Sequence, residues 1–394
     1  KSILYMTSVD ISKTNGPGVN EREFIPYLLK LTNYKAHLIL PQPKFSLPKD
    51  VPIEFCTFTQ PIEKRNNILS WIRHQISIIN CFRKVCGKKQ FDYIIMRVGI
   101  FPVAYWYLTQ FTNREIPYVL KHIGNGKFDV FKKKSIIFQI VLPLNRWFFA
   151  SLLKKARIAD VVSEAQRKSI IENYNNSNKV FFIDNGVNIN KFFPKPKKEV
   201  KSKLKFEKHF PIIGYAGNLA WERGGMQIIL ALPEIIRDYP NSRALILGDG
   251  DKMELLYNKV RELGVLDYCI FTGQVDYDQV PDYINCMDIT VSIRYEDTQH
   301  ASELKVRQYL ACGKPVIVSP GSNEFVASEG VGYIVDPHNI KEFTNACQNI
   351  LNLSNQDYLL MSERARSLAT NKLSYESKVI EKLNLWEKYT SVSN

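Results

Sequence analysis

The amino-acid sequence predicts an α/β protein with two doubly wound domains, each a parallel sheet covered by helices. Three observations lead to this prediction. Apolar strand-like runs alternate with segments of helical period along the whole chain, the pattern of parallel sheets. A length of 394 residues exceeds one ordinary core. A stretch rich in Pro and Lys, residues 193–207, separates two such series and is expected to be an interdomain linker.

The first series forms the predicted N-terminal domain, residues 1–192. Helices are expected where apolar residues recur with helical spacing, at 20–32 and 69–85. The chain opens directly in a strand, without the apolar region and cleavage site of a signal peptide. Runs rich in β-branched and aromatic residues predict strands at 2–8, 36–41, 92–98, 118–123, 161–164 and 180–184.

The second series forms the predicted C-terminal domain, residues 208–374, and helical period continues beyond it to the end of the chain. Strands are expected at 212–217, 243–250, 269–275, 288–293, 315–320 and 332–336, with helices between them at 224–239, 255–262, 281–286 and 302–312. Doubly wound sheets hold ligands beyond the carboxyl ends of their strands. The segments that directly follow strands are therefore the candidate sites.

The chain is strongly basic, with a net charge of +14 and a pI near 9.3. This charge predicts a polyanionic partner, which could be a nucleic acid, an acidic membrane surface or a phosphorylated small molecule. No uncharged apolar run reaches the roughly 18 residues that a membrane span needs. The seven Cys, an odd number without a C-x-x-C pair, favour a reducing cytoplasm and no metal site.

Two strand-to-helix turns are rich in glycine and could present backbone amides to a phosphate or a sugar. In the first, Gly16, Pro17 and Gly18 precede a predicted helix, although an ordinary turn explains them equally well. A full G-x-G-x-x-G is missing, which argues against a dinucleotide-dependent oxidoreductase. In the second, Arg223 precedes two glycines at a helix start. The helix dipole disfavours a cation there unless an anion such as a diphosphate binds it.

The stretch "HASELKVRQYLACGKPVIVSP", residues 300–320, offers a third anion site. Ser302 is a plausible N-cap, and the amides from Ser302 to Leu304 open a predicted helix. Lys305 adds a cation in the first turn, where a purely structural helix would not need one. Gln308 lies one turn further along the same face.

These residues resemble the family-4 retaining glycosyltransferases of GT-B fold, whose pattern here is approximately S-P-x-K-x-x-E-Y-x-A-x-G-K-P-V. The matching positions are Ser302, Lys305, Tyr309, Ala311, Gly313, Lys314, Pro315 and Val316. Similar segments elsewhere are "ADVVSEAQ", "DNGVNINKFFP", "YAGNLAWERGG", "ILGDGD", "FTGQVDYDQVPDYINCMD" and "LSYESKVIEKLNLWEKY". The similarity covers almost the whole chain, in the same order.

The resemblance implies that the C-terminal domain binds a nucleotide-diphosphate sugar and that the N-terminal domain holds most of the acceptor across a cleft. It implies that the last helix, 375–394, packs back on the N-terminal domain, and that neither a metal nor a cofactor is needed. Gly16, Pro17 and Gly18 would form the acceptor loop. The implied donor contacts are Gly217, Asn218, Arg223, Val275, Ser302, Glu303, Leu304, Lys305 and Gln308.

The chain departs from the family pattern in its donor site. An acid stands at the position of Gln308 in the family, where it accepts from the ribose hydroxyls. Gln308 keeps an acceptor but gives up a charge-assisted bond of roughly 1.5–3 kcal/mol for a neutral one of about 1 kcal/mol. Asn218 stands where the family has a cation, and His300 where it has a second acid; Glu303 is the substitute that we expect.

The implied catalytic residues are His122, Arg223 and Lys305. His122 ends a strand and is followed by Gly124-Asn125-Gly126, at the place where the family carries a His facing the donor sugar. A structural His is the alternative. In a retaining transfer the nucleotide leaves from the front face and an oxocarbenium-like sugar remains. The site must then stabilise the leaving diphosphate rather than supply a strong base.

The segment 127–157 combines eight basic residues with several aromatic ones. This mixture suits an anionic membrane surface, and a core helix with a solvated basic face is the alternative. No nucleic-acid-binding module surrounds it, so no nucleic-acid partner is expected.

The leading hypothesis is a cytoplasmic hexosyltransferase, peripheral on the inner face of the membrane, that transfers a sugar to a lipid-linked or polysaccharide acceptor. A non-catalytic partner subunit and a nucleotide-sugar epimerase are the alternatives. Uridine and guanosine diphosphate sugars are equally open as donors.

Overall fold

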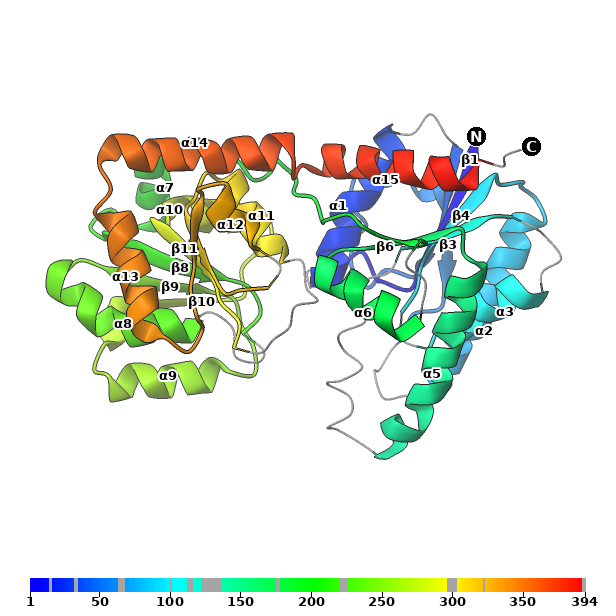
Figure 1. Ribbon diagram of the computed structural model, residues 1–394, viewed down its shortest axis with the longest axis horizontal. Helices are drawn as coiled ribbons and strands as arrows, with labels where there is room; N and C mark the ends of the chain where they lie inside the picture. Colours follow the sequence, from blue (N-terminus) through cyan, green and yellow to red (C-terminus); the bar gives the residue numbers. More distant parts are fainter. Residues whose placement is uncertain are drawn as a thin grey trace. The chain divides into compact units, whose positions relative to one another are not determined.

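The computed structural model describes residues 1–13, 16–31, 35–62, 68–99, 101–111, 116–121, 136–174, 178–219, 225–295, 303–321 and 323–391 (Figure 1). The chain forms two compact units. The first comprises Lys1–Asn185 with Tyr375–Asn394, and the second comprises Gly186–Ser374.

A parallel seven-stranded sheet is the centre of the first unit, in the order β3-β2-β1-β4-β5-β6-β7. Its strands are β1 (Ser2–Thr7), β2 (Lys35–Pro41), β3 (Cys56–Thr59), β4 (Tyr93–Arg97), β5 (Tyr118–Lys121), β6 (Ile158–Val161) and β7 (Val180–Phe182). The sequence prediction missed β3, which has four residues and one fully buried side chain. It also placed β6 three residues too late, because Asp160 interrupts the apolar run.

Helices cover both faces of this sheet: α1 (Gly16–Leu31), α2 (Ile68–Cys86), α3 (Val103–Phe111), α5 (Ile136–Lys155), α6 (Glu164–Tyr174) and α15 (Tyr375–Thr390). Successive residues of a strand point to opposite faces, so β1 serves two cores. Ile3 and Tyr5 pack with α1 and α15, whereas Leu4 and Met6 pack with α2 and α3.

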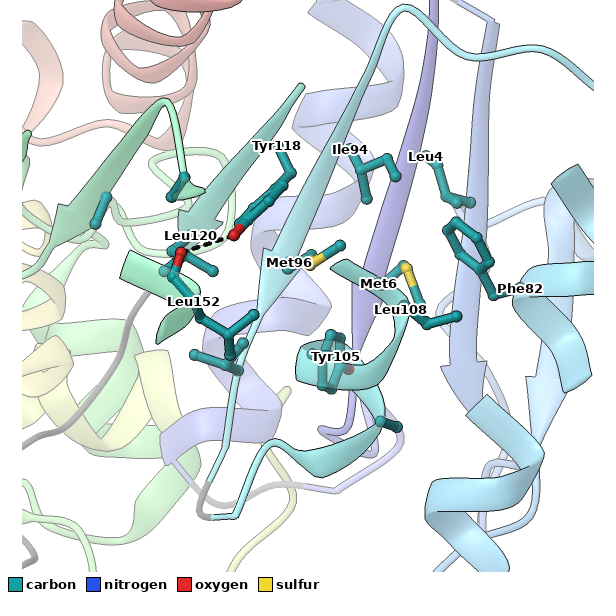
Figure 2. Close-up of a cluster of buried hydrophobic side chains, with 14 of the residues drawn as sticks. Leu4, Met6, Phe82, Ile94, Met96, Tyr105, Leu108, Tyr118, Leu120 and Leu152 are labelled. Atoms are coloured by element: carbon teal, nitrogen blue, oxygen red, sulfur yellow. Dashed lines mark hydrogen bonds between the residues drawn. The ribbon is translucent and has the colours of Figure 1, made fainter. Parts of the chain in front are cut away.

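The second of these cores is drawn in Figure 2, where side chains of β1, β4 and β5 meet those of α2, α3 and α5. A single polar link crosses the part that is drawn: the hydroxyl of Tyr118 donates to the carbonyl oxygen of Leu152 at 2.7 Å. Because Tyr118 is buried, this bond spares its hydroxyl the cost of an unpaired donor.

The C-terminal helix α15 belongs to the first unit and explains the buried acid in β6. Asp160 is fully buried, and its two carboxylate oxygens accept from Lys382 at 3.0 Å and from the indole nitrogen of Trp386 at 2.8 Å. At the start of α15 the hydroxyl of Tyr375 donates to Asn20 at 3.0 Å. The helix is therefore held by directional bonds as well as by apolar packing.

The second unit has a parallel six-stranded sheet in the order β10-β9-β8-β11-β12-β13. Its strands are β8 (Ile212–Ala216), β9 (Arg243–Leu247), β10 (Cys269–Gly273), β11 (Ile289–Ser292), β12 (Val316–Val318) and β13 (Gly332–Ile334). Its helices are α7 (Lys197–Leu204), α8 (Gly225–Asp238), α9 (Met253–Glu262), α10 (Val280–Cys286), α11 (Leu304–Ala311), α12 (Phe325–Ser328), α13 (Ile340–Leu351) and α14 (Asn355–Asn371). The predicted fold class is confirmed.

The stretch 193–207, predicted as a linker, contains helix α7 and lies within the second unit. Its lysines are tied to two buried acids near α10. Lys195 and Lys203 reach Asp282 at 2.5 and 2.6 Å, and Lys197 and Lys201 pair with Asp288. Composition indicated a linker because these partners, which lie about 80 to 90 residues further along the chain, leave no local signal.

Candidate functional site

In both sheets the first strand lies near the middle, and the chain builds outward in one direction before it returns to the other side. This reversal places a switch point between β1 and β4 in the first unit, and between β8 and β11 in the second. At a switch point the connections beyond the carboxyl ends of the strands diverge and leave a crevice in which ligands bind.

Glycine occupies the carboxyl ends of β8 and β9. Gly217 has a φ of 145°, and its amide donates to Leu247 at 2.8 Å. Gly248 has a φ of 126°, and a Cβ there would lie 2.1 Å from the carbonyl oxygen of Gly217. A side chain at Gly248 would thus collide with backbone, so glycine is what allows the two strand ends to approach each other.

Lys305, in the first turn of α11, reaches the same place. Its amine donates to the hydroxyl of Tyr215 at 2.6 Å and lies 3.8 Å from the centroid of that ring. The Tyr215 hydroxyl in turn donates to the carbonyl oxygen of Asn218 at 3.0 Å. A Cβ on Gly217 would come within 2.8 Å of the amine. The half-buried cation of Lys305 is therefore fixed beside half-buried Gly217, the residue that directly follows β8.

Glu303 is buried, and its carboxylate is fully engaged by protein donors. Ser292 donates to one oxygen at 2.8 Å and Arg294 to the other at 2.6 Å. Burial by itself would raise the pKa of Glu303, but the nearby cations of Arg294 and Lys305 outweigh it and hold that pKa below its usual value. This geometry favours a structural role, since the carboxylate ties the end of β11 to the start of α11.

Gln308 lies one turn after Lys305 in α11 and contacts the segment that follows β10. Its amide nitrogen donates to the hydroxyl of Tyr277 in a long bond of 3.4 Å. The ring of Tyr277 is itself covered by the amine of Lys191 at 4.0 Å. With the nitrogen turned toward Tyr277, the amide oxygen is the group of Gln308 that can accept a hydroxyl.

The remaining residues singled out in the sequence divide into two sets. Asn218 is exposed at the end of β8, Val275 is half-buried beyond β10, and Leu304 begins α11. His122, Arg223, Ser302 and His300 lie outside the described residues.

In the first unit the predicted acceptor loop is not a loop. Gly16, Pro17 and Gly18 form the first turn of α1, which begins four residues earlier than the apolar pattern indicated. Proline suits the first turn of a helix because its missing N–H would have no partner there. The carbonyl oxygen of Pro17 accepts from Arg97 at 3.3 Å, so this turn is fixed to the end of β4.

The sequence analysis missed a buried charge cluster directly behind this turn. Glu21 is fully buried, and one of its oxygens lies 2.5 Å from Arg97 and 2.8 Å from Lys121. The hydroxyl of Tyr5 donates to the other oxygen. Burial and then the neighbouring guanidinium of Arg97 lower the pKa of Lys121 to about 8, although Glu21 opposes them. A signal was present: Arg97 and Lys121 are charged residues that end two apolar strands.

Among the residues that the structure describes, no group of three or more His, Cys, Asp or Glu side chains could hold a metal ion. Within the same residues, no helix is both long and apolar enough to cross a membrane.

A protein-family model matches part of the second unit. Residues 210–353 match the family model described as glycosyl transferases group 1. This range contains both glycine-rich strand ends and α11. It therefore includes the described part of the second unit's switch point.

A curated relative extends beyond the family model. The chain is 25% identical over 218 residues to a GDP-mannose-dependent alpha-(1-6)-phosphatidylinositol monomannoside mannosyltransferase of Mycolicibacterium smegmatis. The match covers 54% of this chain and 57% of that protein. It thus spans a little over half the length of either protein.

Two solved structures share the fold over essentially the whole chain. Sucrose-phosphate synthase from Thermosynechococcus elongatus superposes with a TM-score of 0.77 at 16% identity, covering 100% of both chains. The Anabaena protein HepE, in a complex with UDP, gives 0.73 at 16% identity and covers 98% of this chain and 100% of its own. At such identities the likeness concerns the fold.

Proposed function

We propose that this chain, a glycosyltransferase group 1 protein of GT-B fold, transfers a hexose from a nucleotide-diphosphate sugar to a lipid-linked or polysaccharide acceptor with retention of configuration. One observation carries the proposal: the amine of Lys305 lies beside Gly217 at the switch point of the second unit. Glycine backbone that a ligand can approach closely and a fixed cation are what a diphosphate requires.

The arrangement suits the chemistry of the leaving group. As the bond between sugar and diphosphate breaks, negative charge develops on the phosphate oxygen that departs. Lys305 is positioned by Tyr215 before any substrate binds, so little reorganisation is needed when that charge appears. The N-terminus of α11 adds the partial positive charge of the helix dipole at the same end of the sheet.

Gln308 sets the expected donor affinity. A neutral amide oxygen facing a ribose hydroxyl forms a weaker bond than a carboxylate would, so the donor should bind less tightly without losing its place. The nucleobase of the donor, guanine or uracil, is not part of the proposal. The mycobacterial relative is named for GDP-mannose and the Anabaena structure contains UDP, and we propose no choice between the two.

The test is binding and turnover with purified protein. A melting-temperature screen against UDP and GDP sugars should find a stabilising donor, since a ligand at about 100 times its Kd stabilises by about 2.7 kcal/mol. Lys305→Ala should lower kcat about 100-fold or more, the range seen when a group that stabilises developing charge is removed. Lys305→Arg should keep part of the activity. Gln308→Glu should lower the KM for the donor.

The competing proposal is a non-catalytic partner subunit, which the neutral residues Gln308 and Asn218 favour. It predicts that the wild-type chain neither binds a nucleotide sugar nor turns one over. If Gln308→Glu then restored both properties, the proposal of an active enzyme would be wrong and this one would stand.

We further propose that α5 contacts an anionic membrane at the cytoplasmic face. Trp147 and Leu144 expose 52% and 50% of their surface, and Arg146, Lys154 and Lys155 are exposed on the same helix. Such a mixture is favoured at a headgroup boundary. The inner side of α5, with Phe149 and Leu152, belongs to the core, as the alternative interpretation expected.

Flotation with vesicles containing phosphatidylserine tests this contact. Trp147→Ala combined with Arg146→Glu should leave the protein in the lower fraction, whereas Arg243→Glu in the second unit should float as the wild type does. Equal flotation of all three proteins would remove α5 from the proposal.

A further inference from the structure

A pocket of about 260 Å³ lies in the first unit, lined by Ser12, Arg22, Phe45 and Ser46. Ser12 follows β1, Phe45 and Ser46 follow β2, and Arg22 is in the second turn of α1. Strands β1 and β2 are parallel neighbours, so the pocket lies at the carboxyl edge of the sheet, where ligands of this fold class bind.

One buried hydroxyl holds the two sides of the pocket together. The oxygen of Ser12, which is 4% exposed, accepts from the amides of Lys44 and Phe45 at 3.1 Å each. The same hydroxyl donates to Asp10 at 2.6 Å. The segments after β1 and β2 are thus fixed to each other, and the pocket is formed before a ligand arrives.

This construction keeps an aromatic ring in solvent. Phe45 exposes 68% of its surface, although its backbone is held by Ser12. A phenylalanine is normally buried, and a ring that is fixed and exposed beside a pocket offers a flat apolar face on which the C–H face of a sugar can lie.

The charged side chain in the lining is a cation, while the carboxylate of Asp10 accepts from the Ser12 hydroxyl. Arg22 supplies a guanidinium, whose planar set of donors matches a carboxylate or a phosphate. Lys13 follows Ser12 in the chain and Lys44 precedes Phe45, so two further cations accompany the lining residues in the sequence. The hydroxyl of Ser46 is a further polar group of the lining.

We propose that this pocket is an acceptor subsite for a sugar that carries a phosphate or carboxylate group, with the ring against Phe45 and the anionic oxygens at Arg22. The inference rests on the proposed function and adds the charge of the acceptor to it. A phosphate would come from a lipid-linked sugar, and a carboxylate from a uronic acid unit of a polysaccharide.

Saturation-transfer NMR with three small probes tests the subsite in the full chain without turnover. The probes are methyl α-glucoside, glucose 1-phosphate and glucuronate. The charged probes should bind the wild type at least about tenfold more tightly than the neutral one, because a charge-assisted bond adds at least about that factor. The tighter of the two charged probes identifies the source of the anion.

Variants assign the binding to the pocket. Arg22→Gln should remove the preference for charged probes, and Phe45→Ala should weaken all three. Arg73→Gln and Phe111→Ala, which replace an exposed arginine and an exposed phenylalanine elsewhere in the first unit, should behave as the wild type does.

Three results would overturn the subsite: equal binding of the three probes, unchanged binding in Arg22→Gln, or a glucose 1-phosphate signal that Lys305→Ala abolishes while Arg22→Gln does not. The melting shift caused by nucleotide sugars should be the same in Arg22→Gln and the wild type. A protein that shows the sugar preference but no such shift would keep the subsite and lose the proposed transferase function, so the two failures are distinguishable.

Discussion

Replacing Glu21 by glutamine should destabilise the first unit strongly although the two side chains have the same shape. Glu21 is the shared partner of Arg97 and Lys121, at 2.5 and 2.8 Å, and all three side chains are at most 3% exposed. The substitution leaves two buried cations without their anion. Breaking a buried pair in this way commonly costs about 3–5 kcal/mol.

Two features of the structure put the expected loss at or below the lower end of this range. Burial already lowers the pKa of Lys121 to about 8, so at pH 7 the variant can release that proton for roughly 1 kcal/mol. For Arg97, exchanging its carboxylate partner for an amide oxygen forfeits about 1–2 kcal/mol. The two terms predict a loss of about 2–3 kcal/mol in the free energy of unfolding.

The sign of the pH dependence follows from the same group. Because the pKa of Lys121 is lower in the folded state, the unfolded state binds more protons above pH 8, and stability from this group rises with pH up to the unfolded pKa. Without Glu21 the folded pKa falls further. The variant should therefore recover stability relative to the wild type between pH 7 and pH 8.

Urea denaturation followed by tryptophan fluorescence measures this, since four of the five tryptophans, at 71, 106, 147 and 386, belong to the first unit. Glu164→Gln is the control, because Glu164 pairs with Arg167 at 2.9 Å on the surface and should cost less than about 1 kcal/mol. Adding Lys121→Met to Glu21→Gln should restore part of the loss. A loss no larger than in the control would refute the reasoning.

Two further predictions concern the second unit. Gly248→Ala should lower the free energy of unfolding by about 3 kcal/mol or more, because its Cβ would meet the backbone of Gly217. It should also abolish the melting shift given by nucleotide sugars. Gly16→Ala is the control, because no atom lies within 4 Å of the new Cβ, and it should leave thermal stability nearly unchanged. Burial lowers the pKa of Lys314 to about 8, so Lys314→Met should flatten the rise of unfolding free energy between pH 8 and 10 in urea titrations; an unaltered slope would show that Lys314 is charged in the folded state.

The candidate site was partly predictable because α11 carries its own local signals. A cation in a first helical turn and a glycine after a strand can be read without knowing any distant contact, and Lys305 and Gly217 are together in the structure. The Glu21 cluster was not predictable in this way. Glu21 and Lys121 are 100 residues apart in the chain. An acid in a helix is expected to be solvated until folding brings the strand ends around it.

By itself, the sequence determined the fold class and the order of most strands and helices, because hydrophobic period and turn residues act over a few positions. Tertiary structure decided which charged side chains of those elements are buried and paired. It made the lysines around α7 part of the second unit by supplying Asp282 and Asp288, and it paired the carboxylate of Glu303 with Arg294. The physical reason is that burial and pairing of a charge depend on groups that the chain brings together only when it folds.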